Sequence, residues 1–515
     1  MRFKVLLLKA LIIPLLSFAQ YTAIPDNNFE QALIDQGIDS EGGPTDGQVL
    51  TSDISGLTNL DVSSNFISDL TGISAFTSLQ TLDCSFNNLI ALDLFNNTAL
   101  LEIDCGENNI GNSGNQLILP NNNILTSLVC RGNNLSGLDV SSYPDLEVLQ
   151  CYNNGPSSIG TLNLSANTKL IDLICHNAGI TSLDISNCIN LDTLWCFSSY
   201  GSPPNSNTLP TLDISSNLAL SEVRCYNSGI NTIALSAGSY NNLIYLDCGD
   251  NNLTSLDSSK FPNIETLWFY YNNISSTNFT NNAALRSLDC GGNTSLNSVN
   301  ISMLTNLERF WCYDNSFTSI DASANTNLIL FNSNSNANLT SVDLPDTITL
   351  EVVSVCCSNL STLDFTNNTG LTYLDIGINN FTSADVSMLS NLEQFYGNSN
   401  QLTYLNIANG NIDNLNWMWA QNNMLDCIQV DDLAKAGAKS SPNWQRDIGA
   451  DFSLDCSLGL EDAIISNIKV YPNPVVETLN IDSKHSGKYS INDILGKSVS
   501  SGEINDGLSL SLIHI

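Results

Sequence analysis

Thiols at regular spacing can form disulfides or bind metal, so the cysteines are considered first. The chain has 15 cysteines in 515 residues, and ten of them occupy one position of a motif that returns about every 21 residues. Other copies place Val62, Phe269, Val355 or Ile376 there, so the position is apolar and faces a core. Buried free cysteine behaves as a small hydrophobic residue, and we predict a column of unbridged thiols. Its members are Cys84, Cys105, Cys130, Cys151, Cys175, Cys196, Cys225, Cys248, Cys290 and Cys312.

Aromatic side chains recur beside these inward positions and form a candidate ligand-binding set. Exposed aromatics next to acids are typical of protein-binding hot spots and sugar platforms, but aromatics also stabilise neighbouring strands without a ligand. Both interpretations stay open. The aromatic strip consists of Tyr152, Trp195, Phe197, Tyr226, Tyr245, Trp268, Tyr270, Tyr271, Trp311 and Tyr313, and Tyr396 follows further along. The acids beside it are Glu222, Asp247, Asp250, Glu265, Glu308 and Asp314.

Catalytic chemistry finds little support in the sequence. His176, His485 and His514 are too scattered for a metal cluster or a catalytic triad. The chain has no G-x-S-x-G, no H-E-x-x-H and no phosphate-binding glycine loop. Most acids recur with the motif, as solubilising strand and turn residues do. We therefore expect no enzyme, no cofactor and no metal centre.

The elements that must position these residues are repeats with the frame L-x-x-L-x-C-x-x-N-x-L. A period of 21 or 22 residues indicates a solenoid, whose units bury their apolar faces only by stacking. The frame resembles the leucine-rich repeat, with cysteine in place of the third leucine. A mainly β solenoid of about 17 coils is expected over residues 57–422. The repeats start at Leu57, Leu79, Leu100, Leu125, Leu146, Leu170, Leu191, Leu220, Leu243, Ile264, Leu285, Leu307, Leu328, Leu350, Leu371, Leu392 and Ile412.

Each repeat has two halves of different expected structure. The first half alternates apolar and polar residues and predicts a short parallel strand. The second is too short for a helix with its loops, so we expect an extended or 3₁₀ segment and a flat stack. The pattern leaves open which half lines a concave side. It also leaves open whether Cys356 and Cys357 both face outward, because a shift of one residue would return one of them to the core.

An asparagine follows each repeat start by eight residues in most copies. Its amide can satisfy buried backbone groups where the chain leaves the strand, so its role is predicted to be structural. Ala178, Ser199 and Ser228 interrupt the series, beside an insertion at residues 200–207. The structural asparagines include Asn87, Asn108, Asn133, Asn251, Asn272, Asn293 and Asn315.

The net charge limits the class of binding partner, and the N-terminal segment indicates where in or outside the cell the protein functions. Asp and Glu number 51 against 16 Lys and Arg, for a formal net charge of -35. This charge argues against nucleic acid and anionic membranes and suits a cationic partner or Ca²⁺. Arg2 and Lys4 precede an apolar run, and residues 17–19 suit cleavage, so residues 1–19 are predicted to be a signal peptide. No later segment is apolar over the length of a membrane span.

Residues 20–56 are predicted to cap the first coil, because a solenoid end exposes its core. Asp26 can cap a short helix that buries Phe29 and Leu33. The following glycine-rich turn is either a calcium loop or a solvated turn, and the full calcium-binding pattern is missing. The acids of this turn are Asp39, Glu41 and Asp46.

Two segments follow the repeats. Residues 423–459 resemble the C-terminal cap of secreted leucine-rich repeat proteins, which implies a disulfide between Cys427 and Cys456, with Trp444 over the last coil. Residues 465–515 contain YPNP at 471–474, LNI at 479–481 and YSINDILGKSV from Tyr489. These motifs resemble the small β-sandwich-like sorting domain of the type IX secretion system of Bacteroidota. The family ends with a further strand and often a basic tail, so the domain is expected to be truncated.

These resemblances imply an exported protein, extracellular or on the outer cell surface, that meets the type IX secretion machinery. The first expected function is protein binding or adhesion through the aromatic strip. The alternatives are a polysaccharide-binding accessory protein and a structural spacer without a specific ligand. Binding to a soluble glycan would favour the polysaccharide alternative, and indifference to mutations along the strip would favour the spacer.

Overall fold

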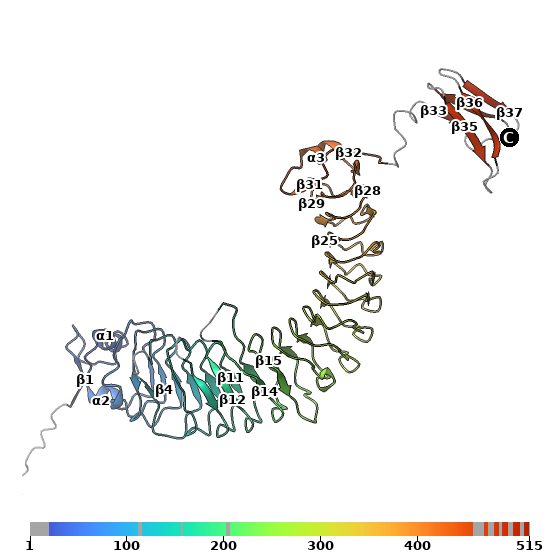
Figure 1. Cartoon of the computed structure of the whole chain (residues 1–515). Helices are drawn as coiled ribbons and strands as arrows, with labels where there is room; N and C mark the ends of the chain where they lie inside the picture. The colour runs from blue at the N-terminus through green and yellow to red at the C-terminus, as the bar shows by residue number, and fades with distance from the viewer. Residues whose placement is uncertain are drawn as a thin grey trace, which may run out of the picture.

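The computed structural model describes residues 20–111, 116–155, 158–201 and 206–456, together with the backbone of five strands between residues 468 and 513 (Figure 1). In the described repeats, 18 parallel strands form one continuous main sheet, each pairing with the strand of the next coil. The predicted signal peptide, residues 1–19, lies outside the described residues.

The main sheet runs in chain order from one end of the solenoid to the other. Its strands are β3 (Asn59–Asp61), β4 (Thr81–Asp83), β6 (Glu102–Asp104), β8 (Ser127–Val129), β9 (Val148–Gln150), β11 (Asp172–Ile174), β13 (Thr193–Trp195), β15 (Glu222–Arg224), β17 (Tyr245–Asp247), β18 (Thr266–Trp268), β19 (Ser287–Asp289), β20 (Arg309–Trp311), β22 (Leu330–Asn332), β24 (Val352–Ser354), β25 (Tyr373–Asp375), β27 (Gln394–Tyr396), β29 (Trp417–Ala420) and β31 (Trp444–Arg446). Seventeen of these strands come from the expected repeats. The last of these repeats starts at Leu415 rather than at Ile412, because Asn416 N donates to Glu393 O of the preceding coil at 2.7 Å. The predicted C-terminal cap supplies the eighteenth strand, β31.

The second halves form short parallel sheets of two to four strands on the opposite side. Their strands are β5 (Leu92–Asp93), β7 (Leu117–Ile118), β10 (Gly160–Asn163), β12 (Ile180–Asp184), β14 (Thr211–Asp213), β16 (Thr232–Ala234), β21 (Ser319–Asp321), β23 (Ser341–Asp343), β26 (Ser383–Asp385), β28 (Tyr404–Asn406), β30 (Cys427–Gln429) and β32 (Asp451–Ser453). Two 3₁₀ segments, η1 (Ile73–Ala75) and η3 (Ser258–Lys260), lie in the same half.

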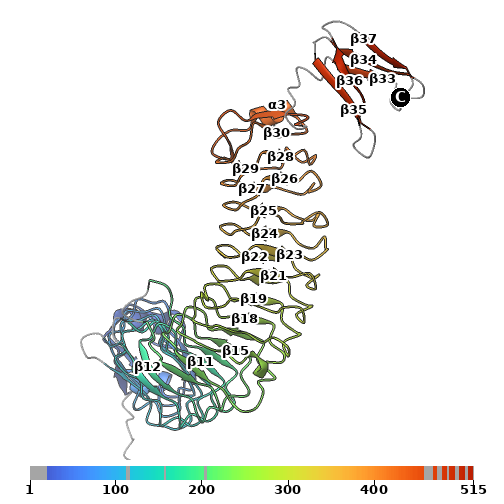
Figure 2. The ribbon, with the colours of Figure 1, turned by 45° about the vertical axis from the view of Figure 1, so that its right-hand side comes forward.

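The solenoid is curved, with the main sheet on its concave side and the short sheets on its convex side (Figures 1 and 2). The expectation of a flat stack was therefore wrong. The main sheet is paired without interruption, which holds its strands at about 4.8 Å. The second halves are paired only in places, so their coils spread further apart. The cysteine-bearing half thus lines the concave side.

The core consists of leucines and cysteines stacked from coil to coil. All ten cysteines of the predicted column are buried and free. Burial raises the pKa of these thiols, for Cys105 and Cys151 to about 12. The column therefore stays protonated and acts as apolar filling.

The asparagines bridge successive coils where the chain leaves the main sheet. Asn272 Nδ2 donates to Cys248 O and Phe269 O, both at 3.0 Å, and its Oδ1 accepts from Leu253 N at 2.9 Å. Asn293 repeats the arrangement one coil further on. Each amide thus satisfies backbone groups of two coils, as buried polar groups require. The same coil-to-coil donation is made by Asn87, Asn108, Asn133, Asn251 and Asn315.

The insertion in the seventh repeat moves the asparagine rather than removing it. Asn207 Nδ2 donates to Cys175 O and Cys196 O, both at 2.9 Å, and its Oδ1 accepts from Ile180 N at 2.8 Å. Asn207 thus takes the place expected for Ser199. One coil later, the Ser228 hydroxyl donates to Cys196 O at 3.0 Å. The ladder thus continues at two of the three predicted interruptions, whereas Ala178 has no hydrogen-bonding side chain and leaves it broken in one coil. Residues 202–205 of the insertion lie outside the described part.

A helix and a strand pair cover the first coil. α1 (Asn27–Asp35) begins at Asp26, whose Oδ1 accepts from Asn28 N at 2.9 Å and Phe29 N at 3.0 Å. Phe29 and Leu33 are fully buried. β1 (Tyr21–Ala23) pairs antiparallel with β2 (Gln48–Leu50), which leads into α2 (Thr51–Ile54).

The acids of the N-terminal turn accept hydrogen bonds from nearby groups of the same chain. Asp39 Oδ1 accepts from Glu41 N at 3.2 Å, and Glu41 Oε1 accepts from the Tyr21 hydroxyl at 3.0 Å. Asp46 Oδ1 accepts from Gln48 N at 3.2 Å. Within the described ranges, no three His, Cys, Asp or Glu side chains are grouped to hold a metal ion.

The C-terminal end of the solenoid is closed by α3 (Leu433–Ala438), β31 and β32. Cys427 and Cys456 form a disulfide. Trp444 is buried over the last coil, and its Nε1 donates to Leu415 O at 3.1 Å. Residues 457–459 of the expected cap lie outside the described residues.

The final segment forms antiparallel strands. β33 (Ile468–Tyr471), β34 (Thr478–Ser483) and β37 (Ser509–Ile513) make one sheet, and β35 (Gly487–Asn492) pairs with β36 (Ser498–Ile504). Residues 472–474 of the YPNP motif lie outside the described residues. Among the described helices, none has the length and apolar character needed to cross a membrane.

Candidate recognition face

The concave face presents four side-chain positions per coil: the first and third residues of each strand, and the second and third residues after the strand ends. Strands pair in register, so each position forms a row across the coils. For example, Trp195, Arg224, Asp247 and Trp268 are successive register partners. The predicted aromatic strip occupies these four rows between β9 and β20.

Four aromatic rings in the row just after the strands stack face to face. The ring centres of Tyr152 and His176 lie 4.5 Å apart, those of His176 and Phe197 4.3 Å, and those of Phe197 and Tyr226 4.4 Å, with planes within 19°. Offset stacking at this distance stabilises each pair. Phe197 is buried by its neighbours, so as an exposed ligand contact it was predicted wrongly.

His176 was not recognised as part of this face from the sequence. It occupies an aromatic position of the repeat, and burial lowers its pKa to about 4. The ring is therefore neutral at physiological pH and acts as an aromatic plate. Its only sequence signal is its place two residues after Ile174, the last residue of β11.

Arg224 lies between two rings of the strip. Its guanidinium carbon is 4.6 Å from the ring centre of Trp195 and 4.7 Å from that of Tyr245. Arg224 Nε donates to Glu222 Oε1 at 2.6 Å, and Trp195 Nε1 donates to the same oxygen at 3.0 Å. The concave face thus holds a guanidinium by cation–π contact and a carboxylate.

Two carboxylates alternate with tryptophans in the row of third strand residues. Asp247 is followed by Trp268, Asp289 and Trp311, one per coil. The rings of Trp268 and Trp311 meet edge to face at 6.5 Å. Burial raises the pKa of Asp247 to about 6 and that of Asp289 to about 7. Asp289 was not among the predicted acids.

Glycines create the space in which two tyrosines lie against the preceding coil. A Cβ at Gly249 would meet the ring of Tyr270 at 2.4 Å, and one at Gly291 would meet the ring of Tyr313 at 2.6 Å. These rings are half-buried, whereas Tyr271 is 48% exposed. Tyr271 is therefore the most accessible ring of the strip.

The other predicted acids divide into two groups. Glu265 and Glu308 lie at the edge of the sheet, where Arg286 Nη1 approaches Glu308 Oε1 at 2.6 Å and Arg286 Nε lies 4.0 Å from Glu265 Oε2. Asp250 and Asp314 lie on the concave face in the same row as Tyr271. Only the second group is placed to meet a ligand on the strip.

Cys356 and Cys357 both face outward. Val355 fills the inward position and is fully buried, which settles the register. The two sulfurs lie 2.7 Å apart, and both residues are half-buried. They are the accessible thiols of the described residues.

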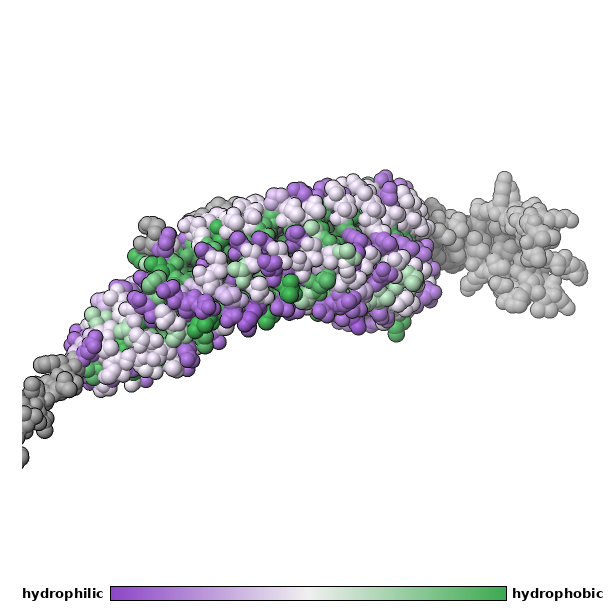
Figure 3. Space-filling model, turned by 90° about the horizontal axis from the view of Figure 1, so that it is seen from below, coloured by the Kyte–Doolittle hydropathy of each residue, from purple (hydrophilic) through white to green (hydrophobic). Residues whose placement is uncertain are grey.

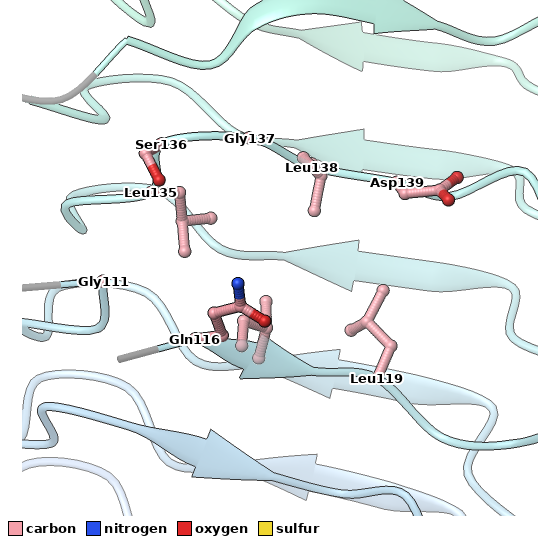
Figure 4. A pocket seen from close by; sticks show the side chains of 9 residues that line it. Gly111, Gln116, Leu119, Leu135, Ser136, Gly137, Leu138 and Asp139 are labelled. Carbon is pink, nitrogen blue, oxygen red and sulfur yellow. The ribbon is translucent and has the colours of Figure 1, made fainter. Parts of the chain in front are cut away.

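A cavity of about 440 Å³ lies between second halves on the convex side (Figure 4). Its lining includes Leu119, Leu135 and Leu138, with Asp139 as the ionisable group. The Asp139 carboxylate accepts from Ser141 N at 2.9 Å, so it offers no catalytic pair. Elsewhere on the convex side, apolar residues lie among polar ones (Figure 3). The concave face is the stronger candidate.

Comparisons with known proteins identify both parts of the chain. Residues 469–513 match a family model described as a secretion system C-terminal sorting domain. The functional domain of InlJ from Listeria monocytogenes, which includes a cysteine ladder, is 26% identical with a TM-score of 0.60, covering 80% of this chain and 82% of that one. YopM from Yersinia enterocolitica is 18% identical with a TM-score of 0.49, covering 73% and 75%.

A leucine-rich repeat protein of Acanthamoeba polyphaga mimivirus is 32% identical over 94 residues, which are 18% of this chain and 21% of that protein. The chain thus spans about a fifth of that relative's length. Together with the coil-by-coil sheet and the cysteine column, the likenesses to InlJ and to the mimivirus protein agree with the repeat frame. The chain is a leucine-rich repeat protein with a C-terminal sorting domain of the type IX secretion system, which marks it for export to the cell surface or the extracellular space.

Proposed function

We propose that the protein binds a polypeptide partner through the concave face between β9 and β20. The observation that carries this proposal is the continuous aromatic surface across these strands, half-buried and flanked by carboxylates. Half-buried aromatic side chains lose little conformational freedom on binding, which makes them effective contact residues. An adhesion role at the cell surface would follow from such binding.

The state of the rings favours a polypeptide over a polysaccharide. Sugars bind aromatic platforms through open ring faces. Here the faces of Tyr152, His176, Phe197 and Tyr226 are covered by one another at 4.3–4.5 Å. What they offer a partner is ring edges and hydroxyl groups, which suit the mixed polar and apolar surface of an extended polypeptide.

The test is a selection of random dodecapeptides displayed on phage against the immobilised full chain. Trp311→Ala and Tyr271→Ala remove exposed parts of the strip, and Tyr404→Ala removes a convex aromatic as the matched control. We expect selected peptides whose binding is weakened at least tenfold by the first two changes and not by the third. A glycan array with the same variants runs in parallel.

Each outcome decides between the functions considered. Glycan binding that Tyr271→Ala abolishes, without any selected peptide, would replace this proposal with polysaccharide binding. If neither peptides nor glycans bind, and the circular dichroism spectrum is unchanged in all variants, the protein would be a structural spacer without a specific ligand. Peptides that bind all variants equally would place the interaction off the concave face.

A further inference from the structure

The concave face accommodates its own arginines in a repeated way. Arg224 lies between two rings and on a carboxylate, as described above. Arg131 does the same nearer the N-terminus: its guanidinium carbon lies 5.8 Å from the ring centre of Phe86 and 6.0 Å from that of Tyr152. Its Nη1 donates to Asp104 Oδ2 at 3.2 Å. Aromatic ring and carboxylate together are thus the guanidinium site of this surface.

The same arrangement recurs eight coils later without an arginine. Tyr271 occupies the repeat position of Phe86, and Asp289, one coil on, occupies that of Asp104. The residue two coils on, where Arg131 would lie, is Tyr313. The ring centres of Tyr271 and Tyr313 lie 5.8 Å apart. The ring and the carboxylate are therefore present, but no lysine or arginine of the described residues stacks on this ring or pairs with this carboxylate.

Local backbone geometry keeps Tyr271 accessible. Asp250, Tyr271, Gly292 and Asp314 occupy one position in four successive coils, and all four have φ between 47° and 68°. A Cβ at Gly292 would lie 2.2 Å from Tyr271 Cδ1, so the ring rests on the glycine backbone of the next coil. Its remaining surface faces the concave side, with a carboxylate in the coil before it and another two coils beyond.

The charges around this ring are uncompensated within the described residues. Neither Asp250 nor Asp314 has an ion pair there with lysine or arginine. Burial and the charges of Asp314, Asp289 and Asp250 raise the pKa of Tyr271. The nearby Arg309 lies 3.8 Å from Glu308 at the sheet edge. A cation arriving from outside would be attracted to this point.

We propose that Tyr271, flanked by Asp250 and Asp314, binds an arginine side chain of the polypeptide partner. The inference rests on the proposed function and names the group that the partner presents. Arginine is favoured over lysine because its planar guanidinium stacks on a ring while donating to carboxylates at its edge, as Arg131 and Arg224 do. We call this location the Tyr271 site.

The test compares three peptides with the repeat Arg-Gly-Ser, in which arginine is kept, replaced by lysine, or replaced by neutral citrulline of the same shape. Each is titrated into the full chain by calorimetry at low and moderate salt. The arginine peptide is expected to bind about tenfold more tightly than the citrulline peptide. Tyr271→Ala, and Asp250→Asn combined with Asp314→Asn, should each reduce this preference to about twofold.

A convex variant controls for charge alone. Asp321→Asn with Asp343→Asn removes the same two charges from paired strands β21 and β23 and should leave the preference intact. An equal loss in this variant, or equal binding of lysine and arginine peptides that Tyr271→Ala does not change, would mean diffuse attraction and overturn the inference. If the phage-selected peptides need the strip but lack arginine, the Tyr271 site fails while polypeptide binding stands. Failure of all peptides would refute both.

Discussion

Replacing Asp289 by asparagine should stabilise the protein above neutral pH. Burial raises the pKa of Asp289 from 3.8 to about 7, so ionisation opposes folding. Its contribution to stability is fully present below about pH 4 and is lost as the pH rises through 7. A shift of about three units corresponds to about 4 kcal/mol at 1.36 kcal/mol per unit. Asparagine keeps an oxygen for Gly291 N but buries two new amide hydrogens, so we expect a gain of about 2 kcal/mol at pH 8.5.

The assay is urea unfolding followed by circular dichroism at pH 4, 6, 7 and 8.5. The unfolding midpoint of the variant should lie below that of the parent at pH 4, where only the cost of the buried amide applies, and should rise above it as the pH passes through neutrality. Asp321→Asn is the matched control, since hydrogen bonds from Ser323 lower the pKa of that exposed carboxyl and its loss should slightly destabilise the protein at pH 8.5. A pH-independent effect of Asp289→Asn, or a loss of stability at pH 8.5, would refute the reasoning.

Three further predictions concern the scaffold. Asn293→Ala should cost about 3 kcal/mol in urea unfolding, because it leaves buried backbone groups of two coils unpaired; a cost below 1 kcal/mol would contradict the ladder's role. In the folded protein, Ellman's reagent should react only with Cys356 and Cys357, which are the accessible thiols, and the other thiols should respond only after denaturation. Reaction of the folded protein that persists after serine replacement of both would contradict the assigned register. Removing the Cys427–Cys456 disulfide, which spans 29 residues, should cost about 3–4 kcal/mol and expose Trp444 to fluorescence quenchers, whereas unchanged quenching would show that the cap closes without it.

The repeating part of the fold was readable because each signal occurs many times. The cysteine position, filled elsewhere by Val355 or Ile376, had to be inward, and the structure buries it throughout. The curvature was not readable, because it depends on how far the second halves pair, and those halves share one sequence pattern. Asn207 was missed because the insertion shifts it out of the eight-residue spacing that identified the others.

The candidate face was only partly predictable. The outward aromatics follow from the alternation of strand residues, but their mutual burial depends on contacts between coils about 21 residues apart. Gly249 and Gly291 gave no signal alone, although they decide where Tyr270 and Tyr313 lie. Arg224 gave no signal in the sequence, because a single guanidinium between two rings depends on how neighbouring coils stack.

The cysteine column has a consequence for how the chain must be made. Once the coils have closed, these thiols are buried and protonated, and an oxidant meets only the outer pair. Before the coils form, all of these thiols are exposed, and any two of them can form a disulfide in an oxidising compartment. Productive folding therefore requires the coils to form faster than disulfides do. Contacts mostly between adjacent repeats favour such fast folding. Oxidation has one correct product, the bond at the C-terminal cap, and it should come last.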